Sequence, residues 1–380
     1  MWIERLLLTD FRNHAQLSLV LDAQPVVLAG PNGAGKTNVL EAVSLLTAGQ
    51  GLRRAAYAEL ARRDGPGGWA VAGTLRDGPR SVAIGTGVVA SETGSDRTGR
   101  IVRLDGQTQT GSGVLAEHVE MLWLTPAMDG LFTGPASDRR RFLDRLVLCL
   151  DPAHAARAGQ FERTMRQRNR LLDDGVRDPA RFRGLELVMA QTGVAMAAAR
   201  AQAVASLCAN IEARRAHAPH SPFPWATVAL TGSLEAAVLA RPAVDVEDAY
   251  GAALESGRER DRAAGRTLEG PHRADLVVGH GPKAMPSEAC STGEQKALLI
   301  GLVLAHAEML AARRDGVAPI LLLDEIAAHL DEKRRHALFQ ELLGLGTQAW
   351  LTGTDRSAFA GLLNKAQFLT VEEGRIAAAA

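Results

Sequence analysis

The pattern of hydrophobic and polar positions divides the chain into three blocks with different periods. The first block, residues 1–125, alternates short apolar runs with turns rich in glycine and aspartate, which predicts strands. Residues 39–46 place apolar side chains at helical spacing, so this block should also contain a helix. The clearest strand candidates cover residues 25–29, 69–75, 80–84, 100–104 and 120–124.

From residue 135 onward the apolar positions change to helical spacing. Proline cannot continue a helix, so Pro219, Pro222 and Pro224 should end the longest helical stretch. A break in that stretch at Gly193 is one reading of the pattern. The helices predicted in this block cover residues 139–150, 155–172, 179–217 and 246–264.

The third block begins near residue 270 and alternates helices with strands. Such alternation is typical of α/β folds. We therefore expect an α/β domain built from residues 1–125 and 269–380, split by a mainly helical lobe of residues 126–268. The helices predicted here cover residues 294–314 and 332–343, and the strands cover residues 319–323, 348–351 and 367–371.

A glycine-rich motif, GPNGAGKT, follows the first apolar strand and opens the first helix. In this context backbone N–H groups and the positive helix end face a bound phosphate. Lys36 should reach the β- and γ-phosphates of ATP, and Thr37 should bind Mg²⁺. The alternative is a chance glycine-rich turn, which the flanking strand and helix disfavour. The predicted nucleotide-binding residues are Gly30, Pro31, Asn32, Gly33, Ala34, Gly35, Lys36, Thr37 and Asn38.

Composition narrows the class of protein further. A length of 380 residues leaves room for two domains, and 46% hydrophobic residues can form a substantial core. The 43 basic and 43 acidic residues cancel, so any nucleic-acid site must be a local patch. Only five of the basic residues are lysines. One of them is Lys36, which suggests that the loop needs a compact point charge.

Three observations predict a cytoplasmic protein without a membrane partner. Cys149, Cys208 and Cys290 are widely spaced and form no metal-binding pattern, so we expect free thiols. The N-terminal segment MWIERLLLTDF carries charges that a signal peptide lacks. The most apolar stretch, residues 192–211, is rich in alanine and broken by Arg200, which favours a packed helix over a membrane span.

A second motif with chemical content is PILLLDEIAAHLD, residues 319–331. An apolar strand that runs into Asp-Glu delivers two carboxylates at its carboxyl end. Asp324 should join Thr37 around Mg²⁺, and Glu325 should polarise the water that attacks the γ-phosphate, so Glu325 and Lys36 are the predicted catalytic residues. The alternative is an ordinary strand followed by a helix-capping aspartate, which a phosphate-binding loop in the same chain makes less attractive.

The segment STGEQK, residues 291–296, opens the helix that precedes this strand. A serine and a glycine at a helix N-terminus can bind an anion. Ser291 with Glu294 three residues later also reads as a capping box, and both interpretations can hold together. The order of the three motifs is that of ABC-type ATPases, in which this serine caps the γ-phosphate bound by another subunit.

Taken together, the motifs resemble the RecF family of ABC/SMC-type ATPases from one end of the chain to the other. GPASDRRRFLD is the most discriminating of them, because ordinary transporter ATPases lack it. The segments that carry the resemblance, in family order, are DFRNH (residues 10–14), GPNGAGKTNVLEAV, GPASDRRRFLD (134–144), GPHRADL (270–276), STGEQKALLIGLVLA and LLLDEIAAHLD.

The resemblance implies a fold and a function. The fold is an ABC/SMC-type P-loop ATPase head with an inserted, mainly helical second lobe. The ligands are ATP and Mg²⁺, and ATP drives a homodimer in which Ser291, Gly293, Glu294 and Gln295 act in trans. The family further implies weak, DNA-stimulated ATP hydrolysis and binding to duplex and to gapped or single–double strand junction DNA. It also implies work with RecR and RecO in loading RecA during recombinational repair and the SOS response.

Three departures from the family pattern affect the expected chemistry. PAMD at residues 126–129 replaces the usual PEDL, so no Q-loop residue is assigned. Many relatives have a second aspartate where this chain has Glu325. The glutamate makes this position more similar to ordinary ABC ATPases. In LTGTD, residues 351–355, Thr354 occupies the expected position of the switch histidine of transporters, which favours slow hydrolysis.

Residues 139–170 contain nine arginines against three acidic residues, so this segment is the candidate DNA surface. The alternative is a solvated helix face with internal ion pairs, and Arg140 and Arg141 can be structural. His272 and Arg273 can face DNA, nucleotide or the protein itself. With only 4% aromatic residues, backbone contact with duplex is favoured over base stacking. The predicted DNA contacts are Arg157, Arg163, Arg166 and Arg170.

Two other classes of ATPase fit less well. A transporter subunit has its two nucleotide motifs closer together and a switch histidine. A full SMC protein carries a far longer heptad insertion. A further alternative is an ATP-gated clamp in which hydrolysis serves only to reset the DNA-bound state.

Overall fold

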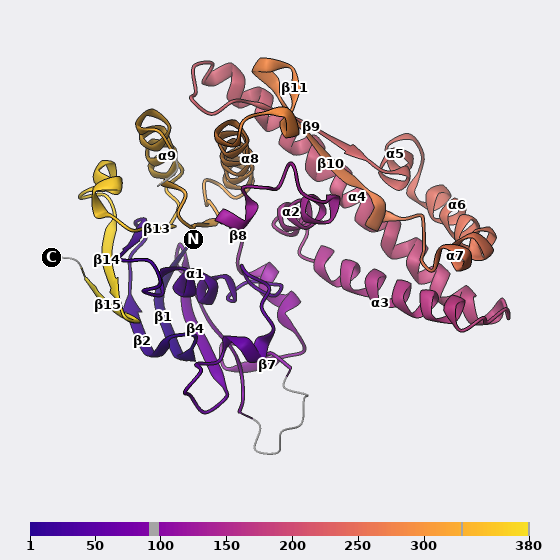
Figure 1. Ribbon diagram of the computed structural model, residues 1–380, viewed down its shortest axis with the longest axis horizontal. Helices are drawn as coiled ribbons and strands as arrows, with labels where there is room; N and C mark the ends of the chain where they lie inside the picture. Colours follow the sequence, from indigo (N-terminus) through magenta and orange to yellow (C-terminus); the bar gives the residue numbers. More distant parts are fainter. Residues whose placement is uncertain (91–98, 328–329, 379–380) are drawn as a thin grey trace. The chain divides into compact units, whose positions relative to one another are not determined.

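The computed structural model describes residues 1–90, 99–327 and 330–378, which form two units (Figure 1). The first unit contains Met1–Asp129, Ala218–Pro224 and Ser291–Ala380. The second contains Gly130–His217 and Trp225–Cys290. The predicted α/β class with an inserted, mainly helical lobe is confirmed. The predicted end of that lobe at residue 268 differs from the second unit, which runs on to Cys290 because β10 (Asp275–His280) pairs with β9 (Ala226–Thr231).

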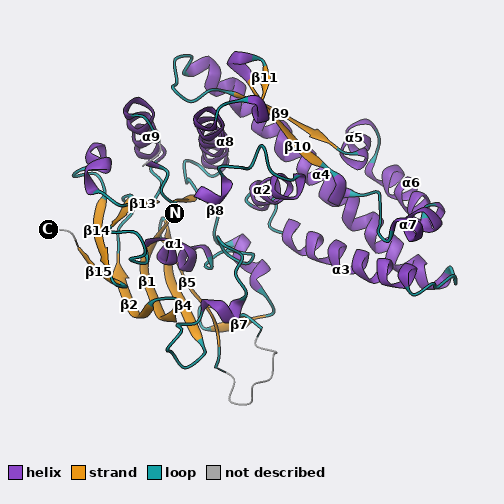
Figure 2. Ribbon diagram, in the orientation of Figure 1, coloured by secondary structure: helices purple, strands orange, loops and turns teal. Residues whose placement is uncertain are grey.

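One sheet of the first unit is antiparallel (Figure 2). In the first strand along the chain, β1 (Trp2–Phe11), Ile3, Leu6 and Leu8 are buried. A bulge between Ile3 and Arg5 shifts the alternation of buried and exposed residues by one. This irregular period explains why the sequence pattern gave no bounds for that strand. In sheet order the strands are β2 (His14–Val20), β1 (Trp2–Phe11), β4 (Trp69–Asp77), β5 (Arg80–Val88), β6 (Ile101–Leu104) and β7 (Gln107–Gln109).

The other sheet of the first unit is parallel except for its last hairpin. Its central strands are mostly apolar and almost entirely buried, as expected for strands covered on both faces. In sheet order they are β15 (Arg375–Ala378), β14 (Gln367–Glu372), β3 (Val26–Ala29), β13 (Ala349–Gly353), β12 (Ile320–Leu323) and β8 (Met121–Leu124). The helices of this unit are α1 (Lys36–Ser44), α8 (Thr292–Arg313) and α9 (Glu332–Leu345).

The second unit is built around one long helix, α4 (Ala180–His217). It packs against α3 (His154–Asp173), α5 (Ser233–Ala240) and α6 (Ala243–Ser256). Phe161, Met189, Val194, Tyr250 and Leu254 lie in its hydrophobic core. A small sheet of order β11-β10-β9 completes the unit. The remaining elements are α2 (Ala136–Leu148), α7 (Arg258–Ala264) and β11 (Met285–Pro286).

Short 3-10 turns connect these elements in both units. In the first unit they are η1 (Tyr57–Leu60), η2 (Ser112–Glu117), η3 (Pro126–Met128) and η8 (Arg356–Leu362), and in the second η4 (Pro271–Arg273), η5 (Gly281–Lys283) and η6 (Ser287–Ala289).

Helix α5 was not predicted from the sequence. The other helices and the parallel strands lie within a few residues of their predicted bounds, with two differences. The break considered at Gly193 is absent, and α4 continues through it. A Cβ atom at Gly193 would lie 3.1 Å from the Tyr250 ring and 3.3 Å from the Phe161 ring, so the glycine serves close packing. The helix predicted over residues 246–264 is divided into α6 and α7 at Gly257, and it begins earlier, at Ala243.

Two described helices, Ala180–His217 and Thr292–Arg313, are long and apolar enough to cross a membrane by length and composition alone. In the most apolar window of the second, 78% of the residues are buried inside the protein. The core helices of folded domains have the same composition, so this feature is weak support for membrane insertion.

Candidate nucleotide site

The phosphate-binding loop begins where β3 ends, at Ala29, and leads into α1 at Lys36. Gly35 has φ 111°, and a Cβ atom there would lie 2.4 Å from Asn13 Nδ2. A Cβ atom at Gly30 would lie 2.1 Å from the Val371 carbonyl oxygen. Both positions therefore require glycine, and the strand–turn–helix context predicted from the motif is present.

Lys36 folds back over its own loop. Its Nζ donates to the carbonyl oxygens of Gly30 at 2.7 Å and Pro31 at 2.8 Å. Burial lowers the pKa of Lys36, and the nearby charges of Glu325 and Asp324 oppose that effect. The ammonium is thus bonded to neutral acceptors at the start of the loop, where an anionic phosphate can replace them.

The two nucleotide motifs meet at the carboxyl end of the parallel sheet. Asp324, buried at the end of β12, accepts a hydrogen bond on Oδ1 from Thr37 Oγ1 at 3.0 Å. Mg²⁺ in nucleotide sites is bound by one or two protein oxygens together with phosphates and water, so Thr37 and Asp324 fit this ion. Among the described residues no three or more His, Cys, Asp or Glu side chains are grouped so that they could hold a metal ion. Within the motif at residues 319–331, Ala328 and His329 lie outside the described part.

Residues that the sequence analysis did not assign support the loop. Asn13 Nδ2 donates to the Ala34 carbonyl oxygen at 3.1 Å, and the Gly374 N–H donates to the same oxygen at 3.1 Å. Asn38 Nδ2 donates to Asn13 Oδ1 at 2.7 Å. Asn13 belongs to the DFRNH segment, so its sequence signal was present, whereas Gly374 lies in a hairpin with no recognisable motif.

A second support lies on α1. Glu41, 2% exposed, accepts two hydrogen bonds from Arg12 and one from Arg53. Arg53 also donates to Asn38 Oδ1 at 2.8 Å. Two guanidinium groups share one carboxylate here, which leaves excess positive charge beside the phosphate-binding loop.

Ser291 lies at the N-terminus of α8 and forms the capping box that its spacing to Glu294 predicted. The Ser291 N–H and hydroxyl both donate to Glu294 Oε2, at 3.0 and 2.9 Å. Ser291 and Gly293 are exposed, while Gln295 is buried. The capping interpretation is confirmed, and the exposed serine remains available for the predicted contact in trans.

The segment without an assigned Q-loop residue forms η3 and ends at Asp129. Asp129 Oδ2 lies 3.3 Å from Nζ of Lys296, a buried lysine in the first turns of α8. The acidic residue of PAMD therefore contacts α8, the helix that the STGEQK segment opens.

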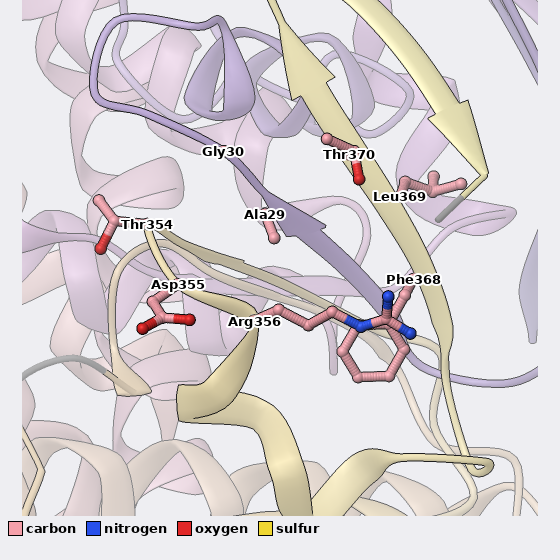
Figure 3. A pocket seen from close by; sticks show the side chains of 8 residues that line it. All are labelled: Ala29, Gly30, Thr354, Asp355, Arg356, Phe368, Leu369 and Thr370. Carbon is pink, nitrogen blue, oxygen red and sulfur yellow. The ribbon is translucent and has the colours of Figure 1, made fainter. Parts of the chain in front are cut away.

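A cavity of about 220 Å³ lies beside the start of the phosphate-binding loop (Figure 3). Thr354 is exposed at its wall, and Arg356 lies over the Phe368 ring, 4.9 Å from its centroid. Thr352, two residues earlier, is a second threonine that contacts Asp324, with its Oγ1 2.7 Å from Oδ1. The cavity is lined by Ala29, Gly30, Thr354, Asp355, Arg356, Phe368, Leu369 and Thr370.

In the second unit, the predicted DNA-contacting arginines of α3 differ in their surroundings. Arg163, Arg166 and Arg170 are exposed, and Arg166 has a weak ion pair with Glu162 at 3.7 Å. Arg157 is half-buried and paired with Asp151. Three of the four side chains therefore lie at the surface of this helix.

Other arginines of the basic segment are structural. Arg168 is fully buried and donates to Glu186, Asp261, Thr267 and the Leu254 carbonyl oxygen. On the same helix Met165 is half-buried and packs against the hydrophobic core of this unit. The positions that α3 buries are His154, Phe161, Thr164, Arg168 and Leu172.

Comparison with known proteins identifies the family. Residues 2–360 match the family described as RecF/RecN/SMC N terminal domain. The DNA replication and repair protein RecF of Mesorhizobium japonicum is 57% identical over 376 residues, covering 98% of this chain and 97% of the relative. RecF of Rhizobium johnstonii is 56% identical over 374 residues, covering 98% of each. The chain belongs to the RecF family.

Solved structures agree with this family in fold. The recombination mediator protein RecF-ATPrS of the RecFOR pathway has a TM-score of 0.85 at 21% identity, covering all of this chain and 98% of that one. The Smc head domain of Pyrococcus furiosus, bound to the C-terminal domain of ScpA, has a TM-score of 0.54 at 15% identity, covering 100% and 96%. The ABC/SMC-type ATPase head predicted from the motifs is thereby confirmed.

The RecF family segments of the second unit hold that unit together. In GPASDRRRFLD, Arg139 forms a bidentate pair with Asp275, and Arg140 donates to the Ala274 carbonyl oxygen at 2.7 Å. In GPHRADL, a ring nitrogen of His272 lies 3.0 Å from the Thr267 carbonyl oxygen, and burial lowers the pKa of His272. Of the residues left open above, Arg140 and His272 have structural contacts, while Arg273 is exposed.

Proposed function

We propose that this chain is an ATP-dependent DNA-binding repair protein that dimerises when it binds ATP. In this proposal it binds duplex and gapped or single–double strand junction DNA and hydrolyses ATP weakly, with stimulation by DNA. It acts in the cytoplasm with RecR and RecO to load RecA in recombinational repair and the SOS response. Relatives above 50% identity that are named DNA replication and repair protein RecF support this assignment.

The observation that carries the nucleotide part of the proposal is the contact between Thr37 and Asp324. It joins the first turn of α1, which follows the phosphate-binding loop, to the end of the strand that delivers two carboxylates. Lys36 binds the β- and γ-phosphates, while backbone N–H groups of the glycine-rich loop and of the first turn of α1 bind the remaining phosphate oxygens. Mg²⁺ held by Thr37 and Asp324 neutralises phosphate charge when it is bound.

Glu325 has the role of a water-orienting base. It follows Asp324 directly, so it stands next to the metal ligand at the same edge of the sheet. A carboxylate there orients water toward the γ-phosphate and accepts its proton. With the exposed Thr354 in the place expected for a switch histidine, no imidazole adds to the charge on the γ-phosphate, which agrees with a slow enzyme.

The exposed arginines of α3 supply the DNA part of the proposal. Their guanidinium groups are available for phosphate oxygens, and such contacts do not depend on base sequence. An ATP-driven dimer would bring two copies of this helix to one DNA molecule. Binding would therefore be tighter with ATP than without it, as multivalent contact predicts.

Two substitutions test the nucleotide assignment. Lys36→Ala should abolish tight ATP binding, because it removes the charge that faces the phosphates. Glu325→Gln should retain ATP binding and lose turnover, by about 100-fold or more for a general base. Lys365→Ala, which changes an exposed lysine, is the matched control. Fluorescent-nucleotide titration and phosphate release measure the two properties, and normal turnover by Glu325→Gln contradicts the role of Glu325.

A separate measurement distinguishes an enzyme from an ATP-gated clamp. Residence time on duplex DNA is compared with ATP and with a non-hydrolysable analogue. A longer residence with the analogue supports hydrolysis as the step that releases DNA. Equal residence times contradict that coupling.

A further inference from the structure

Strand β13 lies between the two strands that carry the nucleotide motifs. The sheet order places β3, which leads into the phosphate-binding loop, on one side of β13 and β12, which leads into Asp324, on the other. All three strands are parallel, so their carboxyl ends meet at one edge. Thr352, near the end of β13 and 1% exposed, is therefore adjacent to both motifs.

The hydroxyl of Thr352 joins the two acidic residues. It donates to Asp324 Oδ1 at 2.7 Å, and it accepts the Glu325 N–H at 2.8 Å. Asp324 Oδ1 also accepts from Thr37 at 3.0 Å. Two threonine hydroxyls thus reach the same carboxylate oxygen, one from the phosphate-binding loop and one from the strand between the motifs. Such hydrogen bonds fix the orientation of a metal-binding carboxylate.

Glu325 has an unusual backbone conformation, with φ 53°. A side chain with a Cβ atom is unfavourable in this left-handed region and stays there only where surrounding contacts hold it. The hydrogen bond from the Glu325 N–H to Thr352 is a contact of this kind. It redirects the chain directly after Asp324, and so it sets where the Glu325 side chain begins.

We propose that Thr352 is a positioning residue for ATP hydrolysis, acting through Asp324 and Glu325. Its hydroxyl orients the carboxylate that would bind Mg²⁺ and holds the backbone of the water-orienting residue. The proposal rests on the nucleotide function proposed above. The positioning role is thus assigned to the buried Thr352, and not to Thr354, which the sequence pattern placed at the switch position.

The test compares variants that differ in one hydroxyl. Thr352→Val removes the hydroxyl at nearly constant volume, and Thr352→Ser restores it. Thr347→Val is the matched control. Thr347 lies just before β13 begins, is equally buried at 1% exposure, and donates to the Pro319 carbonyl oxygen. Where valine disturbs folding, Thr352→Ala removes the hydroxyl without adding a methyl group.

Three properties are measured on the full chain: turnover at saturating ATP, the Mg²⁺ concentration that half-saturates binding of a fluorescent ATP analogue, and the melting temperature. For Thr352→Val we expect turnover to fall and the Mg²⁺ requirement to rise, each about 10- to 100-fold, as for other residues that orient metal ligands. Nucleotide binding without Mg²⁺ should be unchanged. Thr352→Ser should resemble the wild type, and Thr347→Val should change only the melting temperature.

The outcomes separate this inference from the proposed function. A wild-type chain that binds MgATP and hydrolyses it, alongside a folded Thr352→Val variant with the same Mg²⁺ requirement and turnover, overturns the inference alone. Equal losses of turnover in Thr352→Val and Thr347→Val also overturn it, because they indicate a general packing effect. A wild-type chain that does not bind ATP overturns the proposed function and the role of Thr352 with it.

Discussion

The charged side chains of the nucleotide motifs are arranged differently from the buried arginines of the second unit. In the first unit, Lys36 donates to two backbone carbonyl oxygens, and Asp324 accepts from two threonine hydroxyls. In the second unit, the buried guanidinium groups of Arg168 and Arg200 are each surrounded by two carboxylates. Neutral partners leave charge available for a ligand, whereas opposite charges use it within the fold. The partner of a charged group, rather than its type, therefore separates a binding site from a structural network.

The largest effect is expected from breaking the Arg168 network. Arg168→Met leaves Asp261 buried without its guanidinium partner, and Glu186 with only Arg258. Removing one member of a buried ionic network typically costs about 3–5 kcal/mol. Denaturant unfolding measures the loss. Arg170→Met, two residues along the same helix and exposed, is the control and should change stability by less than about 0.5 kcal/mol. Similar losses in both variants would contradict the comparison.

The ion pairs of Arg200 with Asp144 and Glu235 predict that the stability of the fold depends on pH. Burial alone would raise the pKa of Asp144, but hydrogen bonding from His154 and the charge of Arg200 hold it at about 2, below the usual 3.8. The lowered pKa contributes stability above pH 3.8 that is lost as the pH falls through about 2, amounting to about 2 kcal/mol. Asp144→Asn should therefore lose less stability than the wild type between pH 5 and pH 2. Parallel pH profiles from chemical unfolding would contradict this assignment.

A moderate effect on dimerisation is expected from a substitution at the surface of the first unit. Ser291→Arg should leave ATP binding by the monomer nearly intact, because Ser291 is exposed and, in the proposed dimer, would act on the nucleotide of the other subunit. It should weaken the ATP-dependent dimer by about tenfold or more, since the introduced arginine adds positive charge and bulk that oppose close association of the subunits. Light scattering with and without ATP measures the dimer fraction. A dimer fraction equal to that of the wild type would count against the proposed ABC-type arrangement.

The smallest effect on folding is expected from the exposed arginines of α3. Replacing Arg163, Arg166 and Arg170 with Gln should leave the fold and ATP binding intact. DNA affinity should fall similarly for all sequences, and the log–log salt slope should flatten by about one unit per lost phosphate contact. The loss should be larger with ATP, because the proposed ATP-driven dimer would present two such helices.

A control for this experiment carries the same change of charge elsewhere. Arg5, Arg80 and Arg103 are exposed on the antiparallel sheet of the first unit, and they are replaced with Gln together. An equal loss of DNA affinity in both triple variants would attribute binding to net charge. An unchanged salt slope in the α3 variant would place the DNA site elsewhere.

The sequence predicted most of the elements and the nucleotide motifs because these depend on local patterns. The GPNGAGKT loop requires glycine at positions where a Cβ atom would clash, so its letters report backbone geometry directly. The apolar run before Asp324 marks a buried strand. The bounds of strand β1 were not predicted, because its bulge breaks the alternation of apolar and polar residues. Helices α6 and α7 were predicted as one helix, because a single glycine separates them.

The sequence by itself determined that this chain has a split ATPase head with a helical insertion, because each motif carries its own local signal. Only the tertiary structure decided which polar residues serve which role. Thr352 and Thr354 are equivalent in the sequence, yet the first lies buried against Asp324 and the second is exposed. Arg168 and Arg170 belong to one basic run, yet the first is buried among carboxylates and the second faces solvent. The physical reason is that burial and partners arise from strands and helices far apart in the chain, which no local pattern records.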